Sequence, residues 1–186
     1  MPVDDILLDA EERMEKSVGV LGNSLRALRT GRASPALVEH IRVDYYGTPT
    51  PLRQIANIGT PEPQLIVIRP FDPGSLKAIE KAIQQSDIGI NPQSDGKFIR
   101  LVIPPMSEER RRQLATQVKH MGEEAKVAIR NVRRDANKAI EQAQKDGLIS
   151  EDEMYRAKED VQELTKQYEG KVDELVKAKT EEVMTV

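Results

Sequence analysis

The chain carries apolar residues at three- and four-residue intervals in three long stretches, the spacing that gives a helix one apolar face. In the first stretch the repeat is carried at every seventh position by Leu7, Met14, Leu21 and Leu28. The second stretch begins after Pro104-Pro105 and ends at Gly147, a residue typical of helix C-termini. The third begins at Ser150, which stands three residues before Glu153 as in a capping box. The pattern therefore predicts three long helices.

A very short loop joins the second and third of these helices, so they must lie antiparallel. The two alone would leave an apolar seam exposed, and the first helix has the pattern to cover it. We therefore predict an elongated, antiparallel three-helix bundle with coiled-coil-like packing. Asp4 and Asp5 are placed to cap the first helix. Gly19 and Gly22 each cost a helix about 1 kcal/mol relative to Ala, and we expect them to permit close packing against a neighbour.

The middle of the chain has a different character. Residues 32–104 hold nine of the eleven prolines and five of the eleven glycines. Strands are predicted at residues 41–45, 65–69 and 98–103, with a short helix capped by Ser75 between the last two. Residues 45–54 are interpreted as a Pro-rich turn with two exposed tyrosines.

These features predict an α+β protein in which a small β/α/β module interrupts the bundle. The bundle is expected to comprise residues 1–30 and 106–186, and the module residues 31–105. Because the chain leaves and re-enters the bundle at neighbouring points, two hinge strands are predicted, at Thr30-Gly31 and at Pro104-Pro105.

Composition narrows the class of protein. The chain has no cysteine, only 3% aromatic residues and no apolar run that could span a bilayer, so we expect a cytoplasmic protein without membrane contact. The net charge of −3 conceals a segment of +6 at residues 110–138 and one of −6 at residues 139–186. This asymmetry indicates either a charged partner or two segments that neutralise each other across a helix hairpin.

Residues that could carry catalysis are sparse. The two histidines, His40 and His120, stand among ordinary polar neighbours, and no nucleophile elbow, phosphate loop or dinucleotide fingerprint is present. We predict no catalytic residue, metal site or cofactor, and hence no enzyme.

The second predicted helix carries a basic pattern. Arg112, Lys119, Lys126 and Arg133 recur at seven-residue spacing on the face we expect to lie opposite the apolar stripe. Arg130 joins this face and Arg134 flanks it. A row of cations on a rigid helix can contact successive phosphates. The alternative is a solvated face on which Glu123 pairs with the neighbouring lysines.

Residues 29–35, 45–54 and 127–137 resemble signature stretches of the ribosome recycling factors of bacteria and organelles. Pro104-Pro105 with residues 108–111, and residues 149–152, also match, and the resemblance covers the whole chain. It implies an L-shaped outline similar to tRNA, and a factor that binds the ribosome after termination. With elongation factor G and its GTP hydrolysis, such factors split the subunits so that mRNA and tRNA leave.

The resemblance also implies roles for single residues. Arg130 and Arg133 match family arginines that contact large-subunit rRNA, and Arg29 and Arg111 are expected to do so as well. Arg32 lies in a matching stretch, whereas Arg112, Lys119, Lys126 and Arg134 rest on the basic pattern alone. We expect a monomer with the ribosome and elongation factor G as partners. The competing hypothesis is a helical adaptor or chaperone that holds proteins through its acidic third helix and apolar seam.

Overall fold

The computed structural model describes residues 2–185, which form two compact units. The first unit comprises residues 2–29 and 108–185, and the second comprises residues 30–107. The first unit is helical and the second contains a small sheet, so the predicted α+β class is confirmed.

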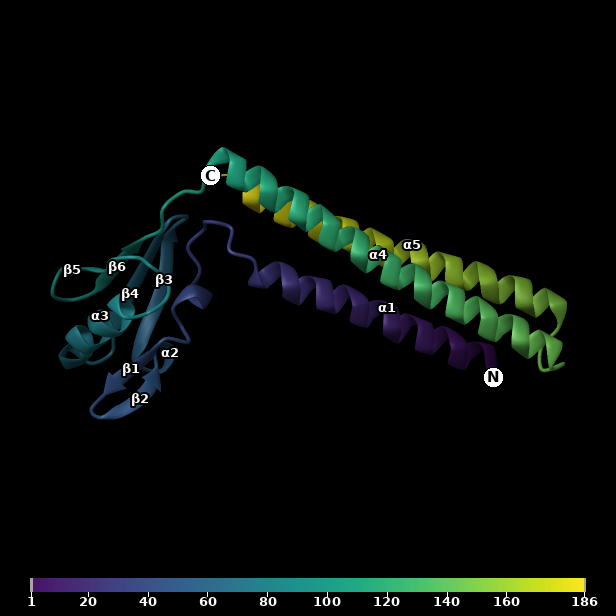
Figure 1. Cartoon of the computed structure of the whole chain (residues 1–186). Coiled ribbons are helices and arrows are strands. Elements are labelled where there is room, and N and C mark those ends of the chain that lie inside the picture. The colour runs from purple at the N-terminus through teal and green to yellow at the C-terminus, as the bar shows by residue number, and fades with distance from the viewer. Residues whose placement is uncertain (1, 186) are drawn as a thin grey trace. The chain divides into compact units, whose positions relative to one another are not determined.

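Three long helices make up the first unit: α1 (Pro2–Ala27), α4 (Glu108–Lys145) and α5 (Glu151–Met184). Each packs against the other two, and α4 runs antiparallel to both α1 and α5 (Figure 1). Helix α1 begins at Pro2, so Asp4 and Asp5 lie in its first turn instead of preceding it. They still complement the positive end of the helix dipole there.

The apolar stripes meet in one continuous core. Met14, Ile129, Ile140, Val161 and Val172 are among its fully buried side chains. Within residues 2–185, α1 and α4 cover the apolar stripe of α5, which is buried at Ala157, Val161, Tyr168 and Val172 and partly buried at Leu164 and Leu175. The adaptor hypothesis required an exposed apolar seam on this helix, and the helix does not provide one in the described residues.

The turn between α4 and α5 follows the sequence signals closely. Gly147 takes a φ of 73°, and the amide of Leu148 donates to the carbonyl of Ala143 at 2.9 Å, which closes the helix end. Ser150 and Glu153 exchange the two hydrogen bonds of a capping box at the start of α5. The turn therefore fixes the register of the hairpin.

Close helix packing occurs at a glycine other than those expected. A Cβ added to Gly19 would meet no atom within 4 Å, and one added to Gly22 would meet only the end of the Arg26 side chain at 3.7 Å. On Gly122 of α4, a Cβ would lie 2.5 Å from Cγ2 of Val176 in α5. The prediction for Gly19 and Gly22 was wrong because both lie on α1 surfaces that no backbone approaches.

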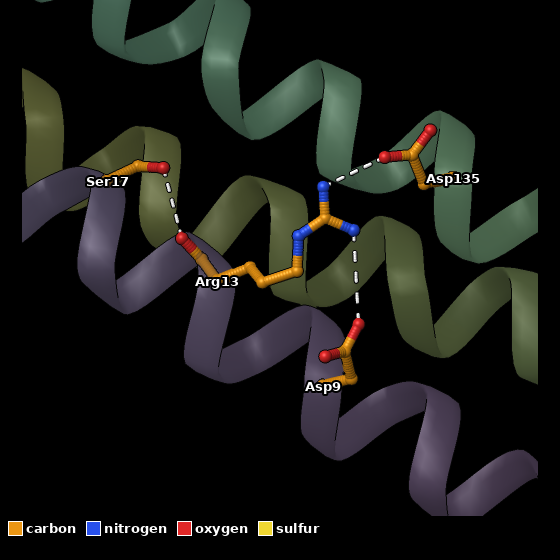
Figure 2. A network of polar contacts seen from close by, with 4 residues as sticks. All are labelled: Asp9, Arg13, Ser17 and Asp135. Atoms are coloured by element: carbon orange, nitrogen blue, oxygen red, sulfur yellow. Dashed lines mark hydrogen bonds and ion pairs between the residues drawn. The ribbon is translucent and has the colours of Figure 1, made fainter.

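A polar contact ties α1 to α4. The guanidinium of Arg13 donates to the carboxylate of Asp135 at 2.8 Å and lies 3.9 Å from the carboxylate of Asp9 on its own helix (Figure 2). The Ser17 hydroxyl donates to the Arg13 carbonyl, within α1. Arg13 is thus shared by two acids at the α1–α4 boundary.

The second unit contains a four-stranded antiparallel sheet in the order β3-β4-β6-β5. Its strands are β3 (Ala56–Glu62), β4 (Leu65–Pro70), β5 (Gln93–Ser94) and β6 (Ile99–Val102). Helix α3 (Leu76–Gln84) contributes Ile79 and Ile83 to the core that buries Ile66, Ile68, Ile99 and Leu101. One face of the sheet is therefore covered by α3.

A separate hairpin precedes the sheet. It pairs β1 (Arg42–Tyr45) with β2 (Thr48–Pro51) and is followed by the short helix α2 (Leu52–Ile55). The single-turn helices at Pro35–Leu37 and Pro73–Ser75 complete the unit. The three predicted strands are present, but β2, β3 and β5 were missed. The prolines of β2 and Gly59 and Pro61 of β3 read as loop, and β5 is only two residues long.

Two local predictions in this unit need correction. Ser75 makes no side-chain cap to α3; the cap of the preceding turn is Asp72, whose carboxylate accepts from the amide of Gly74 at 3.0 Å. Residues 45–54 are a hairpin and a helical turn, not a loop. The Tyr46 hydroxyl donates to Asp72, which ties the hairpin tip to the segment before α3. This contact explains the presence of a tyrosine at position 46, which the sequence alone did not explain.

Candidate nucleic-acid interface

Three basic residues of α4 lie on the flank that faces α5, not on the face opposite the apolar stripe: Lys119, Lys126 and Arg130. Lys126 is the clearest case: its side chain is only 18% exposed and its ammonium lies 2.6 Å from the carboxylate of Asp173 in α5. The prediction was wrong because a seven-residue repeat in α4 runs alongside the apolar stripe, about 100° away from its centre, where the neighbouring helix begins.

Two of the predicted cations take part in a ladder of ion pairs between α4 and α5. Lys126 pairs with Asp173, Arg130 with Glu169 at 3.1 Å, and Glu141 with Lys158 at 2.7 Å. The residue numbers of each pair add up to 299, as an unbroken antiparallel register requires. Once one pair fixes this sum, the residue opposite any other position of α4 follows from the sequence.

The pairing sets the charge state of these groups. The Asp173 carboxylate accepts a hydrogen bond from the Lys126 ammonium and raises the pKa of that ammonium above its ordinary value, against a smaller opposing effect of burial. The hydrogen bond from Lys158 lowers the pKa of the Glu141 carboxyl. Both hydrogen bonds therefore favour the charged form, of the Lys126 ammonium in one pair and of the Glu141 carboxylate in the other.

Arg130 is held in a defined orientation without using its whole guanidinium. Its Nε donates to Glu169, and within residues 2–185 its two terminal nitrogens donate no hydrogen bond. Its side chain is 41% exposed. A guanidinium fixed at Nε can still present its outer edge to a phosphate, as bidentate recognition requires.

Lys119 and Arg133 of α4 have no acid opposite them in this register. The register places Lys166 across from Arg133 and Thr180 across from Lys119, and neither is an acid. Among the described residues, Lys119, Arg133 and Arg134 form no ion pair; Lys119 and Arg134 are exposed and Arg133 is half-buried. The two charged segments therefore neutralise each other only in part.

The start of α4 contributes two more predicted residues. Arg112 is exposed and pairs with Glu108 of its own helix at 2.5 Å. Arg111 is half-buried, and its buried Nε has no hydrogen-bond partner in the described chain. An unsatisfied buried donor is costly, so Arg111 has a reason to engage a further acceptor.

Arg29 and Arg32 are exposed residues on either side of the predicted first hinge strand. Thr30 is buried, and Gly31 takes a φ of 75°, in the region that favours glycine. Pro104 and Pro105 are exposed and lie in irregular backbone between β6 and α4. Thus the predicted basic residues and the predicted hinge adjoin one another along the chain.

The two connecting segments lie side by side within the second unit. A Cβ on Gly31 would stand 3.0 Å from Cγ of Met106. The amide of Ala33 donates to the carbonyl of Pro63 at 2.7 Å, and that of Ile103 to the carbonyl of Gln64 at 2.8 Å. Both connections are therefore fastened to the turn between β3 and β4.

The described chain offers no metal-binding cluster and no membrane-spanning helix. In this part of the chain no group of three or more His, Cys, Asp or Glu side chains is placed to hold a metal ion. His40 and His120 are exposed beside Glu39 and Glu124. No helix in the described range is long and apolar enough to cross a membrane.

The fold defines a class: α+β proteins that combine a long three-helix bundle with a small β-sheet unit inserted between the first two helices. Residues 21–184 match the family model described as ribosome recycling factor. The chain belongs to the ribosome recycling factor family, which are translation factors and not enzymes.

Relatives match along their full length. A ribosome-recycling factor of Acidothermus cellulolyticus is 52% identical over 99% of this chain and 100% of that protein. One from Nitratidesulfovibrio vulgaris is 50% identical over the whole of both chains. The chain thus matches ribosome-recycling factors of different bacteria from end to end.

Two solved structures give the same result. A solution structure of a ribosome recycling factor aligns with a TM-score of 0.75 at 43% identity, covering 100% of this chain and 99% of that one. The Thermus thermophilus factor, described with Escherichia coli elongation factor G bound to the post-termination complex, aligns with a TM-score of 0.65 at 42% identity, covering 99% of this chain and 100% of that one.

Proposed function

We propose that this chain recycles ribosomes in the cytoplasm: it binds the post-termination ribosome and, with elongation factor G and GTP, splits the subunits so that mRNA and tRNA leave. The observation that carries the proposal is the row of cations on α4 that α5 leaves without acids, namely Lys119, Arg133 and Arg134. Family membership supplies the partner for this basic surface.

In this proposal the bundle anchors on large-subunit rRNA through the nine predicted basic residues. These residues differ in how much of each charged group is already engaged by an acid of the bundle. Arg133, Arg134 and Lys119 contact phosphates directly, and Arg130 offers the outer edge of an oriented guanidinium. From residue 112 to residue 134, α4 rises about 33 Å at 1.5 Å per residue, enough to follow several successive phosphates.

The other predicted rRNA-binding residues support this contact. Lys126 joins α4 to α5 and adds charge beside the groove between the two helices. Arg29, Arg32, Arg111 and Arg112 extend the basic surface. The helix bears no Phe, Tyr or Trp that could stack on a base, so the proposal has RNA bound mainly through its backbone and shape.

The inserted unit serves as the part on which elongation factor G acts. Thr30, Gly31, Pro104 and Pro105 set the orientations that this unit can adopt, because Gly31 uses backbone angles closed to other residues and the prolines stiffen the second connection. Gly31→Val should preserve ribosome binding and slow splitting, since a side chain at φ 75° is strained and would collide with Met106.

The proposal is tested with purified post-termination ribosomes, elongation factor G and GTP, following subunit splitting by light scattering. The complete mixture should split ribosomes, and omission of any one component should abolish the signal. Splitting that is equally fast without this chain would refute the proposed function.

A further inference from the structure

The outer face of the four-stranded sheet, on the side away from α3, has the composition of a protein-binding surface. We define this sheet face by Leu65, Val67, Arg69, Phe98, Arg100 and Val102. A shallow depression of about 670 Å³ lies over most of it, bordered by the end of β3 from Gly59 to Glu62. None of these residues belongs to the basic surface of the bundle.

The apolar side chains of the sheet face sit where an antiparallel sheet exposed to water normally carries polar ones. Leu65 pairs with Val102 across β4 and β6, and Val67 pairs with Arg100. Val102 is 55% exposed, although the inward-facing neighbours Ile66 and Leu101 are fully buried. The sequence thus keeps an apolar strip on a surface that the described chain does not cover.

Two arginines stand at one end of this strip. The guanidinium carbons of Arg69 and Arg100 lie 5.8 Å and 5.0 Å from the ring centre of Phe98, so the ring helps to hold both in place. Neither forms an ion pair within residues 2–185. Asp95 interacts with Arg100 only through their opposite charges, and its carboxylate already accepts from the amides of Lys97 and Phe98. The two guanidinium groups are therefore available to an external carboxylate.

This combination selects a protein segment over RNA. Aliphatic side chains offer nothing to phosphates or sugars, and Glu62 on the border would repel a nucleic-acid backbone. The single aromatic ring is already approached by the two arginines, so it offers little stacking surface for bases. A segment with aliphatic side chains next to one or two carboxylates matches both the strip and its charged end.

We propose that the sheet face receives elongation factor G through such an acidic, aliphatic segment. The inference rests on the proposed function, in which this factor acts on the inserted unit, and it adds the surface and its chemistry. The sheet is continuous with both connecting segments, because each is hydrogen-bonded to the turn between β3 and β4, so a force on the sheet face reaches both connections.

The test compares two charge reversals of equal size in the same unit. Arg69→Glu with Arg100→Glu alters the sheet face, whereas Lys77→Glu with Lys81→Glu alters α3 on the opposite side of the sheet. Splitting rates are measured against the concentration of elongation factor G, with ribosome binding measured separately by cosedimentation. The sheet-face variant should need about tenfold or more of the factor for half-maximal splitting, with ribosome binding unchanged. The α3 variant should behave as wild type.

Photocrosslinking from position 102 gives a second readout in a chain that keeps both arginines. Val102→benzoylphenylalanine should crosslink to elongation factor G on post-termination ribosomes, and Arg69→Glu with Arg100→Glu should suppress that product. A crosslink to rRNA or to a ribosomal protein in place of the factor would overturn the inference, as would a normal factor requirement in the sheet-face variant. In both cases wild-type splitting leaves the proposed function intact. Failure of the wild-type chain to split ribosomes would remove both.

Discussion

Gly122 gives the most direct test of how α4 and α5 pack. A Cβ at this position would stand 2.5 Å from Cγ2 of Val176 and 3.7 Å from Cγ1 of Val172. Val176 cannot easily turn away, because a β-branched side chain in a helix has one strongly preferred rotamer. Gly122→Ala must therefore push the two helices apart or strain the valine.

The expected size follows from two opposing contributions. Overpacking a tight contact costs about 1–3 kcal/mol, and replacing Gly by Ala in a helix gains about 1 kcal/mol. Gly122→Ala should thus lower the free energy of unfolding by about 1 kcal/mol. Gly19→Ala is the matched control: its Cβ would meet no atom within 4 Å, so only the gain of about 1 kcal/mol remains.

Urea unfolding followed by far-ultraviolet circular dichroism measures both variants, since the three long helices dominate the signal. Adding Val176→Ala to Gly122→Ala should make room for the new methyl group and recover at least about 1 kcal/mol in a double-mutant cycle. Equal stabilisation by Gly122→Ala and Gly19→Ala would refute the close approach of the two helices.

Three further predictions concern other contacts. Because the ion pair between Arg13 and Asp135 is half-exposed, Asp135→Ala and Arg13→Ala should each lower the free energy of unfolding by less than about 1 kcal/mol. The two substitutions should couple in a double-mutant cycle, and zero coupling would show that the ion pair contributes nothing to stability. The hydrogen bond from Tyr46 lowers the pKa of the Asp72 carboxyl. It therefore stabilises the folded state above the ordinary aspartate pKa, and this stabilisation is lost as the pH falls through the lowered pKa. Tyr46→Phe should flatten this dependence of the unfolding free energy on acid pH, and an unchanged profile would contradict the contact. Lys119→Ala should reduce the salt slope of ribosome binding by about one counterion, whereas an unchanged slope would remove Lys119 from the interface.

Periodicity predicted the helices because each stripe spans many turns. The stripe of α4 continues over 38 residues, so a local exception does not change its assignment, and the capping box at Ser150 fixes where α5 begins. The hairpin turn was predictable for the same reason: the chemistry that ends one helix and starts the next is local.

The strands and the close contacts depended on tertiary neighbours. β3 contains Gly59, Thr60 and Pro61 and becomes a strand by pairing with β4. Nothing in the sequence around Gly122 distinguishes it from other helical glycines, because the close contact is with Val176 of α5. Such features come from partners distant in the sequence, which local propensity does not describe.

The candidate interface was predictable as a set of residues but not as a surface. Seven-residue spacing identified Lys126 together with Arg133, yet only the helix register shows that Asp173 engages the lysine while Lys166 stands across from the arginine. The charge of a helix is thus readable from its sequence, whereas the part of that charge left for a partner depends on the neighbouring helix.

The central claim is that cations left unpaired on α4 hold the protein to ribosomal RNA. Cosedimentation of Arg133→Glu with large subunits over a salt series tests it most directly, with Arg156→Glu on α5 as the control for an exposed arginine in the same bundle. Arg133→Glu should bind more than about tenfold more weakly at moderate salt, because a charge-assisted contact of about 1.5–3 kcal/mol is lost and a repulsion is added, while helicity is unchanged. Arg156→Glu should bind as wild type. Equal affinities for both variants, with wild-type salt dependence, would contradict the account.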